Sequence, residues 1–321
     1  MLRRWSMRNK KKKTLVDGQP APDRNDEYLF YQTLLGTWPL TPMRGEEHQA
    51  FTQRIREYMR KATKEAKVHT SWINPDEPYD NAVQQFIGAV LEDAVFVDAF
   101  KPFAQRIAQY GMYNALAQTL LKLTVPGVPD IYQGNELWDF SLVDPDNRRP
   151  VDYEYRRRLL AALQQQLQAN WHETEPLARE LLASREDGRM KLYVVHRLLS
   201  YRRQYPDLFR NGAYLPLAAG GERQPQVCAF ARQDEQQTLV VMVPRLLTRL
   251  IPDPQVLPLG PEVWANTWVT LPPDGVAHHY RNLFTGKSVA VSGQGGQSGV
   301  ALSDIFAAFP VAVLISDKES G

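Results

Sequence analysis

The stretch VPGVPDIYQGNELWDFSLVDPDNRRPVDY, from Val125 to Tyr153, largely decides the predicted fold. Its first residues, Val125-Pro126-Gly127, end the apolar helical pattern before them, because proline lacks the amide proton that a helix needs. The next residues predict a short buried strand from Val128 to Tyr132. Polar, aromatic and charged residues crowd the segment after Gly134. A strand followed by such a loop is typical of the binding face of an α/β barrel.

The loop after Gly134 carries groups that can bind a sugar or hold the loop itself in shape. Its arginines and aspartates can pair with one another, which would make the segment a structural clamp. The same polar and aromatic groups can instead line a ligand site. Two adjacent arginines are expected to point different ways, one of them holding the loop. The substrate-binding candidates here are Gln133, Glu136, Trp138, Asp144, Asp146, Arg148 and Arg149.

Length and charge limit the classes of function. The 321 residues are 43% hydrophobic and 23% charged, which fits about two globular domains. Seven of the basic residues lie between Arg3 and Lys13, so the net charge of +2 becomes −5 without them. This mildly acidic body argues against a nucleic-acid surface, and the basic head is expected to be a solvated helix or an exposed end. A nucleic-acid-binding tail is the alternative for that head.

The sequence contains no motif for a membrane partner, a metal or a cofactor. No apolar stretch reaches the length of a membrane helix, so no membrane partner is expected. The single cysteine, Cys228, fits a reducing compartment, and we expect a cytoplasmic location. Neither metal-ligand spacing of Cys and His nor a phosphate-binding loop occurs, which predicts no metal and no cofactor.

Helical periodicity fills the first half of the chain and strands fill the last third. Apolar spacings of three and four predict helices within 26–66, with a break at Gly36 and Pro39, and over 83–95 and 103–123. Asp80 is a capping candidate for the second of these regions. Further helices are predicted over 154–169, 175–183 and 189–204. The expected strands are 226–232, 238–244, 267–271, 279–284, 288–292 and 310–316, which suggest an antiparallel sandwich.

The opening stretch also resembles a known family. A G-x-P-x-x-Y-x-G-x-E pattern marks the last barrel strand of the α-amylase family, glycoside hydrolase family 13, and its residues here are Gly127, Pro129, Tyr132, Gly134 and Glu136. The longer text YQGNELWDFSLVDPDNRRPVDYEYRR narrows the resemblance to the maltooligosyl trehalose synthases. Similar segments are Asp23 to Pro39, His69 to Asp80 and Leu208 to Leu217.

The resemblance implies the C-terminal portion of a longer enzyme. The expected fold class is α+β: residues 1–165 as the end of an incomplete (β/α)8 barrel with a helical insertion, 166–207 as linking helices and 208–321 as a β-sandwich. On this view Met1 is an internal start, and the N-terminal barrel portion of the same enzyme is a partner. The intact enzyme would be a (1→4)-α-D-glucan 1-α-D-glucosylmutase. It would convert the reducing-end α-1,4 link of a maltooligosaccharide to an α,α-1,1 link by intramolecular transglycosylation.

The catalytic groups of that family find no counterpart in this chain. In that family the nucleophile lies on a barrel strand with an Arg-x-Asp motif, and a third carboxylate lies in a His-Asp motif. No His-Asp pair occurs here, and no stretch resembles the nucleophile strand. We therefore expect no catalytic residue and no activity of the isolated chain. His69 and Trp72 are added as possible sugar contacts. Two alternatives remain: a non-catalytic carbohydrate-binding or regulatory protein, and a self-sufficient hydrolase that uses Glu136 and Asp144.

Overall fold

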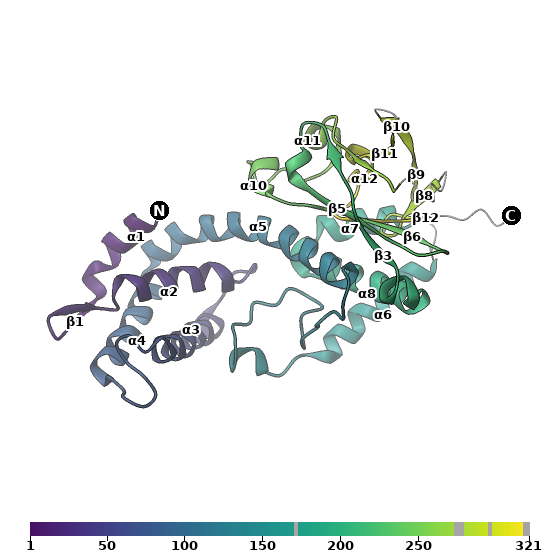
Figure 1. Ribbon diagram of the computed structural model, residues 1–321. Coiled ribbons are helices and arrows are strands. Elements are labelled where there is room, and N and C mark those ends of the chain that lie inside the picture. Colours follow the sequence, from purple (N-terminus) through teal and green to yellow (C-terminus); the bar gives the residue numbers. More distant parts are fainter. Residues whose placement is uncertain (170–172, 273–278, 295–296, 317–321) are drawn as a thin grey trace. The chain divides into compact units, whose positions relative to one another are not determined.

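A computed structural model describes residues 1–169, 173–272, 279–294 and 297–316 (Figure 1). The chain divides into two compact units. The first comprises residues 1–108 and 140–150, and the second comprises 109–139 and the described residues from 151 onward. The long helix α5 (Ala94–Thr124) contributes residues to both units, and so does the stretch from Val125 to Tyr153.

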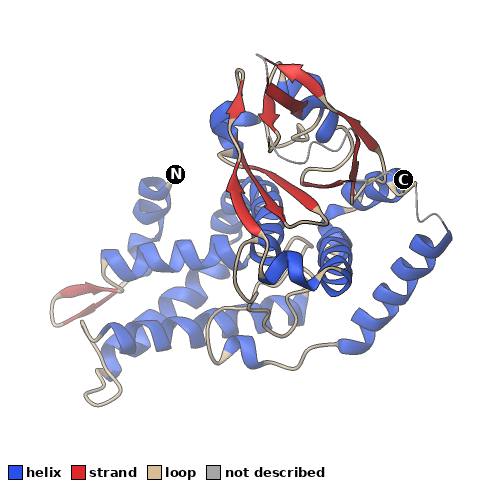
Figure 2. Cartoon of the chain, turned by 45° about the vertical axis from the view of Figure 1, so that its right-hand side comes forward, coloured by secondary structure: helices blue, strands red, loops and turns tan. Residues whose placement is uncertain are grey.

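The first unit consists of helices and one short hairpin (Figure 2). The break predicted near Gly36 and Pro39 separates its second and third α-helices. Its elements are α1 (Leu2–Asn9), η1 (Lys10–Lys12), β1 (Thr14–Val16), β2 (Gln19–Ala21), α2 (Arg24–Thr37), α3 (Gly45–Ala66), α4 (Glu77–Leu91), the first half of α5 and η2 (Asp146–Arg148).

Side-chain caps fix the starts of two of these helices. Asp23 caps α2 by accepting a hydrogen bond from the backbone amide of Asp26, 2.8 Å away. Asp76 caps α4 in the same way, and the prediction of Asp80 as a cap is wrong. Asp80 lies one turn inside α4 and forms an ion pair with Lys64 at 2.9 Å.

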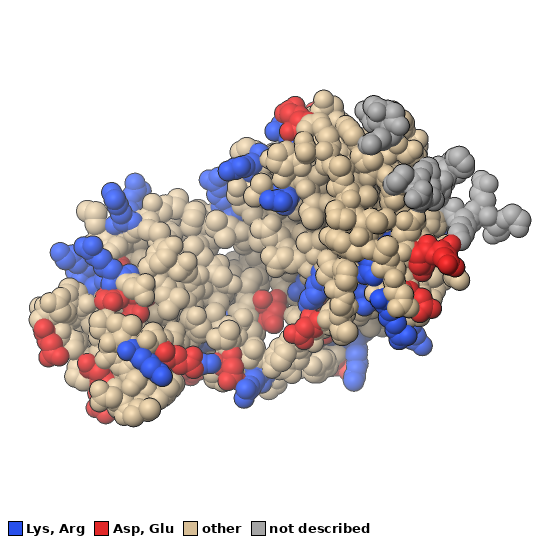
Figure 3. Space-filling model, in the orientation of Figure 1, with Lys and Arg blue, Asp and Glu red and all other residues tan. Residues whose placement is uncertain are grey.

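The basic head packs on the rest of the first unit along one side. The predicted solvated helix forms as α1, and Arg3, Arg4, Lys10 and Lys11 are exposed, but the head is not a free end. Trp5 of α1 is only 3% exposed and packs on Phe100 at a centroid distance of 5.3 Å. Lys12 forms an ion pair with Asp93 at 2.6 Å, and Lys13 pairs with a buried glutamate. In Figure 3 the basic side chains at this end of the unit lie beside acidic ones. Lys12 and Lys13 therefore stabilise the folded first unit through these ion pairs.

The second unit contains helices followed by two sheets. The three helices predicted over 154–169, 175–183 and 189–204 are confirmed, with one added residue at the start of the first. The helical elements are the second half of α5, α6 (Tyr153–Ala169), α7 (Glu175–Ala183), η3 (Arg185–Asp187), α8 (Arg189–Gln204), α9 (Pro206–Arg210), η4 (Gln224–Gln226), α10 (Leu247–Leu250), α11 (Gly260–Trp264) and α12 (Leu302–Ile305).

Both sheets are antiparallel. The larger has the order β3-β5-β6-β12-β8-β9, and the smaller has the order β10-β11-β7-β4. Each of the six predicted strand regions contains a strand. The strands are β3 (Ala213–Pro216), β4 (Ala219–Gly220), β5 (Val227–Gln233), β6 (Thr238–Pro244), β7 (Trp268–Thr270), β8 (His279–Asn282), β9 (Ser288–Ala290), β10 (Ser292–Gln294), β11 (Gln297–Ala301) and β12 (Ala312–Ser316).

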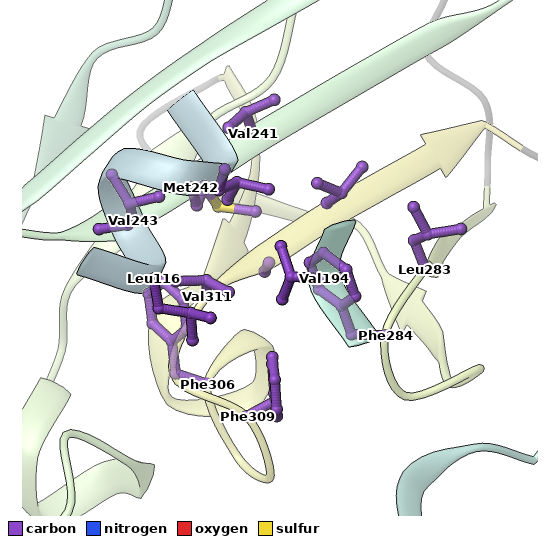
Figure 4. Close-up of a cluster of buried hydrophobic side chains, with 14 of the residues drawn as sticks. Leu116, Val194, Val241, Met242, Val243, Leu283, Phe284, Phe306, Phe309 and Val311 are labelled. Atoms are coloured by element: carbon purple, nitrogen blue, oxygen red, sulfur yellow. The ribbon is translucent and has the colours of Figure 1, made fainter. Parts of the chain in front are cut away.

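The core of the second unit joins helices to the sheet. All seven residues of β6 are buried, as expected of a central strand covered on both faces. Figure 4 shows Val241 and Met242 of β6 near Leu116 of α5 and Val194 of α8. The first unit has a separate core built around aromatic residues of α1, α2 and α5. The helical first unit therefore has a core of its own.

The strand predicted from Val128 to Tyr132 does not form. These residues are irregular, and the side chains of Val128, Ile131 and Tyr132 are 96%, 38% and 46% exposed. A strand needs a neighbour for its hydrogen bonds, and no segment within the described ranges pairs with this one. The coarse prediction of an α+β chain with antiparallel sheets is confirmed. Among the described helices, none is long and apolar enough to cross a membrane.

Candidate functional site

A cavity of about 780 Å³ lies in the first unit between α3 and the loop of residues 143–149. Its walls combine apolar and charged groups, as small-molecule sites commonly do. Phe51 and Tyr58 of α3 supply aromatic surface, since residues seven apart lie on one face of a helix. The loop supplies three predicted site residues, Asp144, Asp146 and Arg149.

Asp146 is the residue that holds this loop. Its side chain is 9% exposed and accepts hydrogen bonds from Arg54 Nε at 2.9 Å and from the amide of Leu142 at 2.6 Å. Arg149 Nε lies 2.9 Å from its other oxygen. The second guanidinium nitrogen of Arg54 donates to the carbonyl oxygen of Phe140. The carboxylate of Asp146 is thus occupied by contacts within the unit.

Asp144 lies at the rim of the same cavity, and its side chain is more exposed than that of Asp146. Its side chain is 45% exposed and pairs with Arg148, whose side chain is 70% exposed. Lys61 of α3 donates to the backbone carbonyl of Asp144, which fixes the main chain, and Oδ1 of the Asp144 carboxylate is buried. The two adjacent arginines therefore take different partners. Asp144 is the more exposed of the two aspartates that line this cavity.

Glu136 belongs to the second unit. Its Oε2 accepts from Arg156 Nε at 3.1 Å, and Arg156 also donates to the carbonyl oxygen of Gly134 at 2.7 Å. This arginine thereby ties the start of the loop to α6. Gln133 is half-buried just before this turn.

Trp138 is anchored on the segment that leads into α8. Its indole N–H donates to the carbonyl oxygen of Arg185 at 2.7 Å. Gly188 approaches closely, since a Cβ atom there would lie 3.1 Å from the amide nitrogen of Trp138. Its φ of +81° also favours glycine. Lys191 Nζ donates to the carbonyl oxygen of Leu137 at 3.1 Å and lies 5.9 Å from the Trp138 ring centroid.

The position of Lys191 changes its acidity. Burial lowers the pKa of Lys191 to about 8, and the like charge of Lys122 contributes in the same direction. The carboxylates of Asp139 and Glu136 oppose this change. A lysine in this environment is easily neutralised and reports on how tightly the loop covers it.

His69 and Trp72 lie in the loop between α3 and α4, and neither lines the cavity beside Asp144. His69 Nε2 lies 2.9 Å from Asp23 Oδ2, and its ring stacks on Tyr79 at a centroid distance of 4.4 Å. Trp72 is 57% exposed, with Lys64 Nζ 5.2 Å from its ring centroid. The nine candidates therefore form three groups: Gln133, Glu136 and Trp138 in the second unit; Asp144, Asp146, Arg148 and Arg149 at the first cavity; and His69 and Trp72 in this loop.

Comparison with known proteins shows which proteins this chain resembles. No protein-family model matches the chain. A Mycobacterium tuberculosis protein (strain H37Rv), described as a maltooligosyl trehalose synthase, is 39% identical over 250 residues. That match covers 77% of this chain and 29% of the relative. Over three quarters of its length the chain is similar to a maltooligosyl trehalose synthase.

Solved structures of synthases agree with this similarity over nearly the whole chain. The maltooligosyltrehalose synthase of Arthrobacter ramosus superposes with a TM-score of 0.71 at 28% identity, covering 98% of this chain and 35% of that one. A Sulfolobus tokodaii structure titled as a hypothetical maltooligosyl trehalose synthase gives a TM-score of 0.60 at 25% identity, covering 98% and 34%. The chain thus spans about a third of the length of the synthases that it matches.

The structure adds residues that could not be recognised from the sequence. Arg54 and Tyr58 line the cavity beside Asp144, whereas the apolar spacing of α3 predicts only an amphipathic helix. The available signal was their spacing. Residues 51, 54 and 58 share one face, and that face continues a core stripe with an arginine and a partly exposed tyrosine. A charged residue inside an apolar stripe indicates a partner on another segment.

Proposed function

We propose that this chain forms about a third of a maltooligosyl trehalose synthase and is inactive alone. The complete enzyme would convert the reducing-end α-1,4 link of a maltooligosaccharide to an α,α-1,1 link by intramolecular transglycosylation. The 39% identity over 250 residues carries this proposal, because it covers most of the chain but only 29% of the relative. The catalytic carboxylates would come from the remaining, N-terminal barrel portion.

The exposed segment from Val128 to Tyr132 supports an N-terminal partner. A β-rich apolar segment without strand neighbours is what remains when a barrel strand lacks the strands beside it. On this proposal residues 1–165 are the end of the barrel with its helical insertion, 166–207 are linking helices and 208–321 are a β-sandwich domain.

The proposal gives the predicted site residues unequal roles. Asp144, at the rim of the cavity, would contact the glucan, and Tyr58 would offer it an aromatic face. Asp146 and Arg149 would hold the loop, because their charged groups bind each other. Glu136 and Trp138 would anchor the start of the loop on the second unit through Arg156 and Arg185.

Reconstitution tests the proposal. The purified chain should convert no maltopentaose to a trehalose-ended product. Adding the separately expressed N-terminal portion of the Mycobacterium tuberculosis relative, which this chain does not match, should restore product and give a complex in size-exclusion chromatography. Turnover by the chain alone that Glu136→Gln abolishes would contradict the proposal and favour the hydrolase.

The cavity itself favours a second candidate, a carbohydrate-binding protein without catalysis. About 780 Å³ of mixed apolar and charged surface lies within one unit and needs no partner. In this case maltoheptaose should bind the isolated chain, and Tyr58→Ala should weaken the binding measured by calorimetry. Tyr28→Ala is the matched control, because Tyr28 is 47% exposed and lies outside the cavity lining. Binding without reconstituted turnover would select this candidate.

A further inference from the structure

A second cavity of the first unit, about 790 Å³ in volume, contains a cluster of potential metal ligands. Asp23, Asp26 and His69 each offer one ligand atom, and these atoms lie within 4.8 Å of one another. Asp23 and Asp26 stand at the N-terminus of α2, and His69 comes from the loop before α4. Their separation in sequence hides the cluster from any search for ligand spacing. The fold alone brings the three together.

The spacing of the donor atoms suits one ion. His69 Nε2 and Asp23 Oδ2 are 2.9 Å apart. Two ligands of a tetrahedral ion with bonds of about 2.1 Å are separated by about 3.4 Å, so the two atoms would have to move apart by about half an ångström. The ion can therefore bind both atoms after a small movement, once the imidazole is neutral with its proton on Nδ1. The same pair of atoms forms a hydrogen bond when no ion is bound.

A second layer of contacts holds these ligands in place. The Tyr79 hydroxyl donates to Asp26 Oδ2 at 2.5 Å, and the Tyr79 ring stacks on His69 with an interplanar angle of 23°. Asp23 Oδ1 is fixed by the amide of Asp26, which leaves Oδ2 directed at His69. Metal ligands are commonly oriented by such partners.

Charge at the cluster favours a cation. Asp26 is only 7% exposed, and no Lys or Arg within the described ranges forms an ion pair with it. Lys13, the neighbouring cation, is engaged with Glu27 at 2.7 Å. Buried carboxylates are stabilised by an opposite charge or by a metal ion.

We propose that Asp23, Asp26 and His69 bind one divalent transition-metal ion, with Zn²⁺ as the best fit to one imidazole and two carboxylate ligands. The ion links the start of α2 to the loop between α3 and α4. Its role is structural, and it does not depend on the function proposed above. Water completes the coordination from the cavity.

Calorimetry on the full chain, stripped of metal with a chelator, tests the site. We expect wild type to bind one Zn²⁺ per chain and to melt at a higher temperature with Zn²⁺ than without it. His69→Gln should weaken binding by about tenfold or more. His48→Gln is the matched control, because His48 lies on α3 outside the cluster, and it should bind as wild type does.

A second variant separates loss of a ligand from loss of fold. Asp23→Asn keeps an N-cap for α2 but removes a charged ligand, so it should fold with unchanged circular dichroism and bind Zn²⁺ weakly. Three results would overturn the proposal: no stoichiometric Zn²⁺ binding by wild type, equal weakening by His48→Gln, or Mg²⁺ binding in preference to Zn²⁺. Each can be observed whether or not the chain acts on glucans.

Discussion

The two halves of the loop that follows Gly134 are held by different forces. Residues 134–139 rest on the second unit mainly through a buried leucine, an anchored indole and a half-buried lysine, with one ion pair between Glu136 and Arg156. Residues 140–149 rest on the first unit through charged groups around Asp146. One continuous sequence thus changes, within a few residues, from an apolar half, held mainly by apolar and backbone contacts, to an ionic half, held mainly by ion pairs. A polar, aromatic-rich loop can be largely structural in one half and open to ligand in the other.

The largest expected effect tests the ionic half. Asp146→Ala removes the partner of Arg54, whose side chain is only 15% exposed, and leaves a partly buried positive charge without its carboxylate. Breaking a buried ion pair on one side costs about 3 kcal/mol. We expect urea denaturation to show a loss of this size. Hydrogen exchange should speed up in residues 140–149 and along α3.

A control and a contrary result sharpen this test. Asp144→Ala should change stability by less than about 1 kcal/mol, because its pair with Arg148 is exposed. If Asp144→Ala destabilises the chain as much as Asp146→Ala does, the rim of the cavity is as structural as its base. The division of roles within the loop would then be wrong.

The next effect tests the apolar half. Trp138→Ala removes the hydrogen bond to Arg185 and a half-buried aromatic ring, which should cost about 2 kcal/mol, below the range for fully buried tryptophan. Faster exchange should be confined to residues 134–139 and the start of α8. Trp72→Ala is the control, since Trp72 is 57% exposed and should have little effect on stability. Faster exchange in α3 as well would mean that the two halves are not independent.

Much of the fold could be predicted because local signals and packing agree there. The pattern from Thr238 to Pro244 gave β6 with correct bounds, since an apolar run between turn residues fits a central strand. The hairpin of β1 and β2 was missed although its signal is present. Asp17-Gly18 is a preferred hairpin turn, and both residues have positive φ, +48° and +76°. The run of lysines beside it favours the interpretation of this region as a solvated helix or an exposed end.

The features that the sequence did not predict correctly share one physical cause. In each case the residue that decides the local structure or contact lies far away in the sequence. Val128 to Tyr132 has strand composition, but a strand exists only where a neighbour accepts its hydrogen bonds. Aspartate commonly caps helices, but Asp80 forms an ion pair with Lys64 instead. His69 meets Asp23 only after the first unit folds. Composition shows which residues can bind, whereas tertiary contacts decide which groups remain available.

The smallest expected effect concerns the lysine beneath the apolar half, and it depends on pH. Lys191 has a pKa of about 8 in the folded chain, compared with about 10.4 for an unperturbed lysine. Between these values the unfolded chain holds more protons, so stability must rise with pH. The destabilisation by the buried charge is complete below pH 8 and fades as the pH increases.

Comparison of wild type with Lys191→Met isolates this contribution from other titrating groups. Relative to the variant, wild type should gain about 1 kcal/mol of unfolding free energy between pH 7 and pH 9. Lys101→Met, which replaces a lysine that is 49% exposed, should show no such difference. If the gap between wild type and Lys191→Met stays constant with pH, Lys191 is hydrated and the segment at Leu137 does not cover it. The anchoring of the first half of the loop would then rest on Trp138 and its partners alone.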